Sequence, residues 1–138
     1  MPDPAATGVE RKTERQSEQG VALMNPEVVV QRRIDAYNAR DLRAFLATYS
    51  DHIRVFRPPS IEPVIVGKAT FGEFYASNRF NKVGLHAELL NRMVIGNRVV
   101  DHERISGVRD EPFEVAIVYE VADDLIQCVW FYQSENDG

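Results

Sequence analysis

The stretch that decides the fold runs from Val28 to Ser60 and reads VVVQRRIDAYNARDLRAFLATYSDHIRVFRPPS. Its apolar residues recur first at helical spacing and then at the alternating spacing of a strand. This pattern predicts two linked amphipathic helices followed by one strand. The pair Pro58-Pro59 ends that strand, because proline has no amide hydrogen to donate to a sheet.

The first helix is preceded by strong start signals. Asn25 is expected as its N-cap and Pro26 as its first helical residue. Val30, Ile34 and Tyr37 follow at i, i+4 and i+7, so they form one apolar helix face.

A second helix is expected after a short break, with Asp41 placed to cap it. The apolar stripe predicted for this helix consists of Leu42, Phe45, Leu46 and Tyr49. Ser50-Asp51 is predicted as a turn, and the strand His52–Arg57 follows with Ile53 and Val55 on one face.

The remainder of the chain adds one helix and a sheet. Val64–Val66 is a short extended piece, and Gly67 opens a third helix. One face of this helix carries Phe71, Phe74, Tyr75 and Asn78. Two hairpins are then expected, with turns at Gly96-Asn97 and Asp123-Asp124. Their strands are Leu85–Ile95 with Arg98–Val108, and Phe113–Val121 with Leu125–Tyr132.

Helices followed by an antiparallel meander predict an α+β domain and not an alternating βαβ arrangement. We expect a cone-shaped, curved mixed or antiparallel sheet with three N-terminal helices packed on its concave face. The natural ligand site is the mouth of the cone, between the helices and the sheet. The expected division is a disordered or loosely packed tail over residues 1–24, one domain over 25–133, and a C-terminal tail over 134–138.

Composition narrows the function classes. The 138 residues fit one domain, and the net charge of −5 argues against a nucleic-acid partner, which needs a basic face. No apolar run approaches the roughly 20 residues of a membrane span, and the N-terminus lacks the apolar core of a secretory signal. A single cysteine, Cys128, excludes an internal disulfide and suits a cytoplasmic location. Met24 is a candidate natural start, since it lies just before the first helix signal.

These patterns resemble the SnoaL-like and ketosteroid-isomerase-like branch of the nuclear-transport-factor-2-like superfamily. The resemblance covers about residues 26–133. It is carried by VVQRRIDAYNARDLRAFLATYSD (29–51), IEPVIVGKATFGEFYAS (61–77), NRVVDHERISG (97–107) and DDLIQCVWFY (123–132). It implies the cone-shaped fold. The superfamily includes isomerases, cyclases, dehydratases, epoxide hydrolases and members that only bind ligands.

The resemblance also implies what this chain does not do. Ketosteroid isomerases use a helix tyrosine, a first-strand aspartate and a protonated aspartate on the penultimate strand. The matching positions here are Arg33, Arg57 and Ile117. A guanidinium is no base near neutral pH, and isoleucine donates no hydrogen bond. Isomerisation by that mechanism is therefore not expected.

The candidate catalytic residues lie in one predicted strand, at Asp101, His102 and Glu103. Alternation puts Asp101 and Glu103 on one face, and the resemblance favours that face as the inner one. A carboxylate among apolar side chains has a raised pKa and can act as a general acid or base. If the phase is reversed, His102 is the inward candidate base. A second interpretation is a buried salt-bridge network with Arg33 and Arg57 and no catalysis.

The candidate substrate-binding residues are Arg33, Tyr37, Arg57, His86, Tyr119 and Trp130. The two arginines suit an anionic or carbonyl group, although their stems can instead pack on the core with their heads in solvent. His86 shares a strand face with Glu88, although a lone histidine on a strand is more often a packing residue than a catalyst. Phe74 and Tyr132 are further aromatic residues that can line a pocket.

Two functions follow. The first is a pocket for a small hydrophobic or amphipathic molecule, with cofactor-independent isomerase, lyase or hydrolase activity by acid–base catalysis. The second is a non-catalytic ligand-binding or dimerisation module. No phosphate loop, nucleophile elbow, dinucleotide fingerprint or metal-ligand spacing occurs, so no cofactor or metal is expected. A homodimer through the convex sheet face is expected, because Val100, Ala116 and Val118 would point outward.

Overall fold

The computed structural model describes residues 25–133. The expectations for residues 1–24, including a natural start at Met24, and for residues 134–138 lie outside this part of the chain. In order, the elements are α1 (Pro26–Asn38), α2 (Leu42–Leu46), β1 (Tyr49–Phe56), β2 (Ile65–Val66), α3 (Lys68–Asn78), β3 (His86–Ile95), β4 (Arg98–Ser106), β5 (Phe113–Ala122) and β6 (Leu125–Tyr132).

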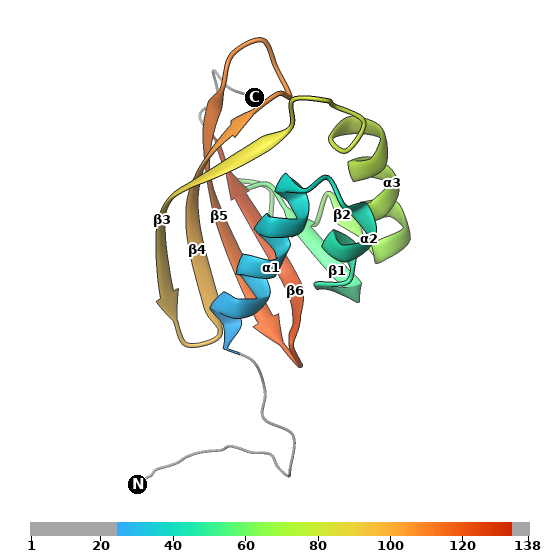
Figure 1. The fold of residues 1–138 in the computed structure, drawn as a ribbon. Coiled ribbons are helices and arrows are strands. Elements are labelled where there is room, and N and C mark those ends of the chain that lie inside the picture. The colour runs from blue at the N-terminus through green and yellow to red at the C-terminus, as the bar shows by residue number, and fades with distance from the viewer. Residues whose placement is uncertain (1–24, 134–138) are drawn as a thin grey trace, which may run out of the picture.

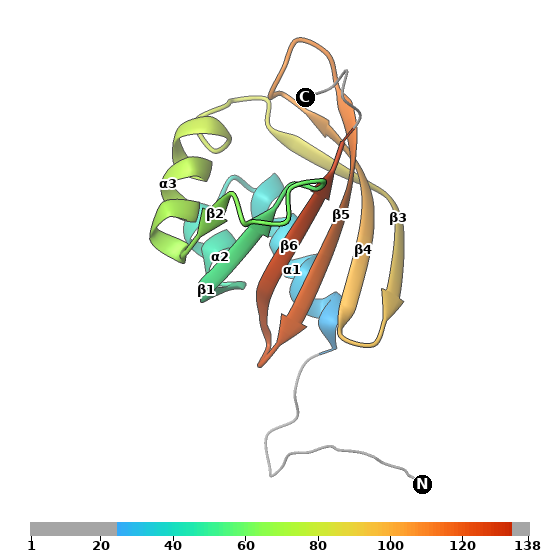
Figure 2. The same cartoon turned by 180° about the vertical axis from the view of Figure 1, so that it is seen from behind.

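A six-stranded sheet has the order β2-β1-β6-β5-β4-β3. The predicted meander of β3 to β6 is confirmed, since each successive pair is antiparallel. β1 joins its edge by running parallel to β6, which makes the sheet mixed. The helices lie on the concave side, with α1 crossing the sheet (Figure 1). From behind, β4, β5 and β6 have no helix in front of them (Figure 2).

The start of α1 follows the sequence signals, with Asn25 at the N-cap and Pro26 in the first turn. The Asn25 side chain makes no capping hydrogen bond, so its position there rests on backbone geometry. Asp41 does cap α2, where its carboxylate accepts a hydrogen bond of 3.0 Å from the amide of Ala44. This bond satisfies one of the free amides at the helix start.

The prediction for the second helix was too long. α2 ends at Leu46, and Tyr49 begins β1, so neither a helical Tyr49 nor a turn at Ser50-Asp51 is found. The cause is pairing with the last strand. The amide of Ile126 donates to the carbonyl of Thr48 at 2.8 Å, and Tyr49 is paired with Ile126. These long-range partners override the local helical spacing.

The core fills the space between the helices and the inner face of the sheet. Phe45 on α2 lies at its centre, fully buried. Its ring is within 6.0 Å, centroid to centroid, of the rings of Tyr37, Tyr49, Phe71, Tyr75 and Phe80. Rings from three helices and β1 therefore fix the helical layer over the sheet.

Both predicted hairpin turns are confirmed. Gly96 has a φ of 58°, and Asp123 and Asp124 have φ values of 56° and 62°. Two successive left-handed residues are typical of the tight turn that matches strand twist. A third left-handed position, Gly107 at φ 85°, follows β4, and a Cβ there would lie against the backbone of Gly84. Only glycine fits that close approach.

Candidate functional site

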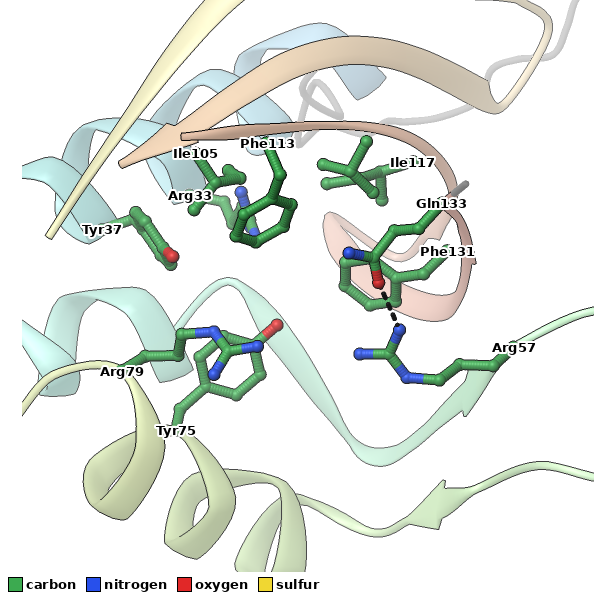
Figure 3. A pocket seen from close by; sticks show the side chains of 11 residues that line it. Arg33, Tyr37, Arg57, Tyr75, Arg79, Ile105, Phe113, Ile117, Phe131 and Gln133 are labelled. Atoms are coloured by element: carbon green, nitrogen blue, oxygen red, sulfur yellow. Dashed lines mark hydrogen bonds between the residues drawn. The ribbon is translucent and has the colours of Figure 1, made fainter. Parts of the chain in front are cut away.

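A pocket opens between the helices and the inner face of β4, β5 and β6 (Figure 3). We call it the arginine pocket. Its lining residues are Arg33, Tyr37, Arg57, Tyr75, Arg79, Ile105, Phe113, Val115, Ile117, Phe131 and Gln133. It thus combines three guanidinium groups with an aliphatic and aromatic floor.

The arginine pocket is small, with a volume of about 30 Å³. This is room for a few atoms of a ligand and not for a whole organic molecule. A second cavity of about 240 Å³ adjoins it and shares Arg57, Tyr75 and Phe131 with it. We call this second cavity the side groove. Its other lining residues are Val55, Val64, Ile65 and Phe74.

Arg33 is buried in the deepest part of the site, with its side chain 3% exposed. Its Nε donates to the hydroxyl of Tyr49 at 3.0 Å, and its guanidinium carbon lies 5.1 Å from the ring centroid of Tyr37. Burial opposes its charge, but the oxygens of Tyr119, Tyr49 and Glu103 hold the pKa of Arg33 well above its usual value. Its head therefore does not reach solvent, and it carries a permanent positive charge.

Glu103 lies beside this buried cation, with Oε2 at 3.7 Å from Nη1 of Arg33. Neither carboxylate oxygen has a hydrogen-bond partner within the described residues. Burial raises the pKa of Glu103, and the attraction of Arg33 opposes that effect. Glu103 faces inward as the alternation predicts, but it lies behind Arg33 and does not line the arginine pocket.

Asp101 also faces inward and is fully buried. Both of its oxygens accept hydrogen bonds from Arg92, at 2.7 and 2.9 Å. The bond to Asp101 raises the pKa of Arg92. A carboxylate held in this bidentate pair is occupied, so Asp101 has no free oxygen directed at the pocket.

Three predicted site residues lie on the other side of the sheet. His102 pairs with Glu114 at 2.7 Å on the convex face, and this contact lowers the pKa of Glu114. His86 is exposed on β3, where its neighbour Ala87 is the buried residue. Trp130 stacks on Phe56 on the outer face. The expectation that His86 and Trp130 line the concave pocket is wrong, because strand alternation points them away from it. His102 lies on the outer face, so the alternative phase that would turn it inward is not found.

The remaining predicted site residues are buried to different depths. Tyr37 and Arg57 line the arginine pocket, where Nη1 of Arg57 donates to Oε1 of Gln133 at 2.8 Å. Tyr119 is fully buried behind the pocket, with its hydroxyl unpaired within the described residues. Burial raises the pKa of the Tyr119 hydroxyl well above its usual value. Phe74 lines the side groove, whereas Tyr132 lies on the convex face beside Trp130.

Sequence reasoning missed two arginines. Arg92 faces Asp101 directly across the β3–β4 hairpin, and counting back from the Gly96-Asn97 turn would have found that pair. Arg57 was expected to pair with these carboxylates instead of Arg92, so the predicted salt-bridge network had one wrong member. Arg79 follows α3 and lines the pocket, but no pattern in the sequence indicates its direction.

None of the helices over residues 25–133 is long and apolar enough to cross a membrane. In the same range no three histidine, cysteine or acidic side chains come together as a metal-ligand set. Cys128 is buried, and burial raises the pKa of its thiol. A protonated, enclosed thiol is a poor nucleophile.

Comparison with known proteins agrees with the fold described above. The SnoaL-like domain matches residues 30–129. An uncharacterised cystatin-fold protein from Novosphingobium aromaticivorans is 25% identical, with 78% of this chain and 97% of that one covered and a TM-score of 0.67. A SnoaL-like protein of unknown function from Burkholderia thailandensis is 20% identical, with 79% and 93% covered and a TM-score of 0.67.

An NTF2-like protein of unknown function from Cytophaga hutchinsonii shares the same fold. It is 12% identical, with 85% of this chain and 96% of that one covered and a TM-score of 0.70. No curated protein gives a significant match.

Proposed function

Because this chain belongs to the SnoaL-like domain family, we propose that it binds a small amphipathic molecule on the concave side of its sheet. The observation that carries the proposal is the pair of adjoining cavities. The arginine pocket is polar and small, and the side groove is larger and lined mainly by apolar side chains. A ligand with one oxygen-bearing end and one apolar body matches this division.

Binding is better supported than catalysis. Asp101 has both oxygens bonded to Arg92, and His102 lies on the far face. Glu103 is the remaining acid–base candidate, and its raised pKa is the observation in its favour. Glu103 does not line the arginine pocket, however, and it is paired with the buried Arg33. If the protein turns over a ligand, Glu103→Gln should abolish turnover.

The test of binding places a large side chain in the side groove. Val64 lines the groove and is 50% exposed, so Val64→Trp should fill the cavity without unfolding the domain. The neighbouring Val66, 57% exposed, does not line it, which makes Val66→Trp a matched control. Titration with 1-octanol, followed by the amide NMR signals of Val115 and Phe131, reports on binding.

We expect Val64→Trp to weaken 1-octanol binding by about tenfold or more, because it occupies the volume that the apolar body needs. Val66→Trp should bind as the wild type does. If 1-octanol and octanoate both leave these signals unchanged at millimolar concentration, the proposed function is wrong.

We also propose that two copies associate through the convex face. One cross-strand row on this face is apolar and continuous. It consists of Phe56, Trp130, Val118, Val100 and Met93, each paired with the next across neighbouring strands. Charged pairs such as His102 with Glu114 flank the row. An apolar stripe with a polar border is the usual composition of a dimer interface.

A further inference from the structure

The charge of the arginine pocket differs from that of the chain. The chain carries −5, yet the pocket is lined by Arg33, Arg57 and Arg79. No aspartate or glutamate among residues 25–133 lines it. A positive lining in an acidic chain is a local arrangement, and its electrostatic complement is an anion.

Two of these arginines are held by aromatic rings. The guanidinium carbon of Arg57 lies 5.1 Å from the ring centroid of Phe131, and that of Arg79 lies 5.4 Å from the ring centroid of Phe74. Stacking uses the flat face of a guanidinium and leaves its N–H groups, which lie in the plane, free to bond. The two side chains reach into the same space from opposite sides (Figure 3).

The same two guanidiniums donate hydrogen bonds to neutral oxygens. Arg57 donates to the side chain of Gln133 at 2.8 Å, and Arg79 donates to the carbonyl of Asn78 at 2.9 Å. Deeper in the pocket, Arg33 adds a third positive charge, and its Nη1 lies 3.7 Å from Oε2 of Glu103, beyond hydrogen-bond distance. An anionic oxygen in the pocket would offer Arg57 and Arg79 charge-assisted hydrogen bonds, which are stronger than those to these neutral acceptors.

The volumes of the two cavities indicate which end of the ligand each would hold. About 30 Å³ beside the three arginines suits a head group of a few atoms. The adjoining 240 Å³, bordered by Val55, Val64, Ile65 and Phe74, suits an apolar body. Arg57, Tyr75 and Phe131 line both cavities, so head and body would be continuous through that boundary.

We infer that the ligand is an amphipathic carboxylate, with its carboxylate among Arg33, Arg57 and Arg79 and its apolar body in the side groove. This inference rests on the proposed function and narrows it to one class of ligand. A carboxylate is planar and accepts two parallel hydrogen bonds from a guanidinium, which matches the exposed N–H edges of stacked arginines.

The test compares octanoate with 1-octanol, which share the same hydrocarbon body and differ in the head. For the wild-type chain, octanoate should bind at least about tenfold more tightly, because hydrogen bonds between charged groups exceed those of a neutral hydroxyl. Arg57→Gln and Arg79→Gln should each lower the affinity for octanoate by about tenfold and lower that for 1-octanol by a much smaller factor. Arg43→Gln is the control, since Arg43 is exposed on α2 and does not line the pocket.

The outcomes separate this inference from the proposed function. Equal affinities for octanoate and 1-octanol would overturn the carboxylate assignment and leave the binding function standing. Unchanged octanoate binding by both Arg57→Gln and Arg79→Gln would overturn it as well. If neither probe binds the wild-type chain, both proposals are wrong.

The same chemistry exists in the chain itself, because Glu135 and Asp137 follow Gln133 in the sequence. The double variant Glu135→Gln/Asp137→Asn distinguishes this source from a free ligand. We expect its octanoate affinity to stay within about twofold of the wild-type value. A tenfold rise would mean that the chain's own carboxylates compete for the arginines, and would overturn the assignment to a free ligand.

Discussion

At the scale of single residues, the buried pair of Arg33 and Glu103 sets the character of the site. The two side chains are 3% and 0% exposed, and their closest charged atoms are 3.7 Å apart. At that separation the pair gains attraction without a hydrogen bond, while both groups have lost water. Such a pair is weak evidence for stability, so its presence beside a cavity points instead to a role in positioning the cation.

Glu103 predicts a specific pH dependence. Burial raises its pKa above the ordinary value of 4.5, so the folded protein keeps this proton at pH values where the unfolded chain has lost it. The contribution of Glu103 to the free energy of unfolding is therefore complete below pH 4.5, and it is lost as the pH rises through the folded-state pKa of Glu103. Glu103→Gln cannot ionise, and its free energy of unfolding should fall less steeply above pH 4.5 than that of the wild type.

Urea unfolding at a series of pH values from about 4.5 to 8 measures this slope. Glu62→Gln, at an exposed loop position, is the control and should keep the wild-type slope. A Glu103→Gln variant with the same pH dependence as the wild type would show that Glu103 ionises alike in both states.

At the scale of elements, the close approach of two loops determines how the β4 end meets the start of β3. Gly107, at φ 85°, lies against Gly84, and a Cβ on Gly107 would collide with the Gly84 backbone. A Cβ on Gly84 would meet its nearest atom, the Cα of Gly107, at an ordinary 3.7 Å. The two glycines are therefore in contact but differ in their tolerance of a side chain.

We expect Gly107→Ala to lower the free energy of unfolding by at least about 2 kcal/mol, from backbone strain and a collision that rigid backbone cannot relieve. Gly84→Ala should change it by less than about 1 kcal/mol. Chemical denaturation of both variants checks this. Equal losses would show that the loop relaxes around the new methyl group.

The helices and strands differ in how well their features could be predicted from the sequence. The inward phase of Asp101 and Glu103 was predictable, because alternation along β4 continues through a hairpin with a clear turn. The length of α2 was not, because Tyr49 pairs with Ile126, far along the chain. Trp130 was misplaced for a related reason: no local pattern states which face of the last strand meets the helices.

The arginines of the site also show which features can be predicted from local sequence and which depend on the tertiary fold. Arg33 and Arg57 were found because they stand at positions singled out by the resemblance, and both line the pocket. Arg79 comes after α3 with no periodic neighbours, so its direction depends on the tertiary fold. The composition of the pocket became evident only once three separate segments were placed side by side.

At the scale of the whole molecule, the apolar row on the convex face predicts a dimer. Val118 lies in the middle of this row, between Val100 and Trp130. Val118→Arg would place a charge at the centre of the interface, where it would lose its water without gaining a partner. Light scattering should give the mass of two chains for the wild type and of one chain for Val118→Arg.

Ile61→Arg is the control, because Ile61 is 87% exposed in the loop before β2 and is not a member of the row. It should keep the wild-type mass. A wild-type mass equal to one chain at micromolar concentration would remove the dimer from consideration.

The parallel pairing of β1 with β6 has a consequence for synthesis in the cell. β1 ends at Phe56, whereas β6 begins at Leu125, so a growing polypeptide carries β1 long before its neighbour exists. Until β6 leaves the ribosome, one edge of β1 and the aromatic layer above it have no lasting cover. The sheet therefore closes late, through a pairing between strands far apart in the sequence, and one edge of β1 stays exposed until then.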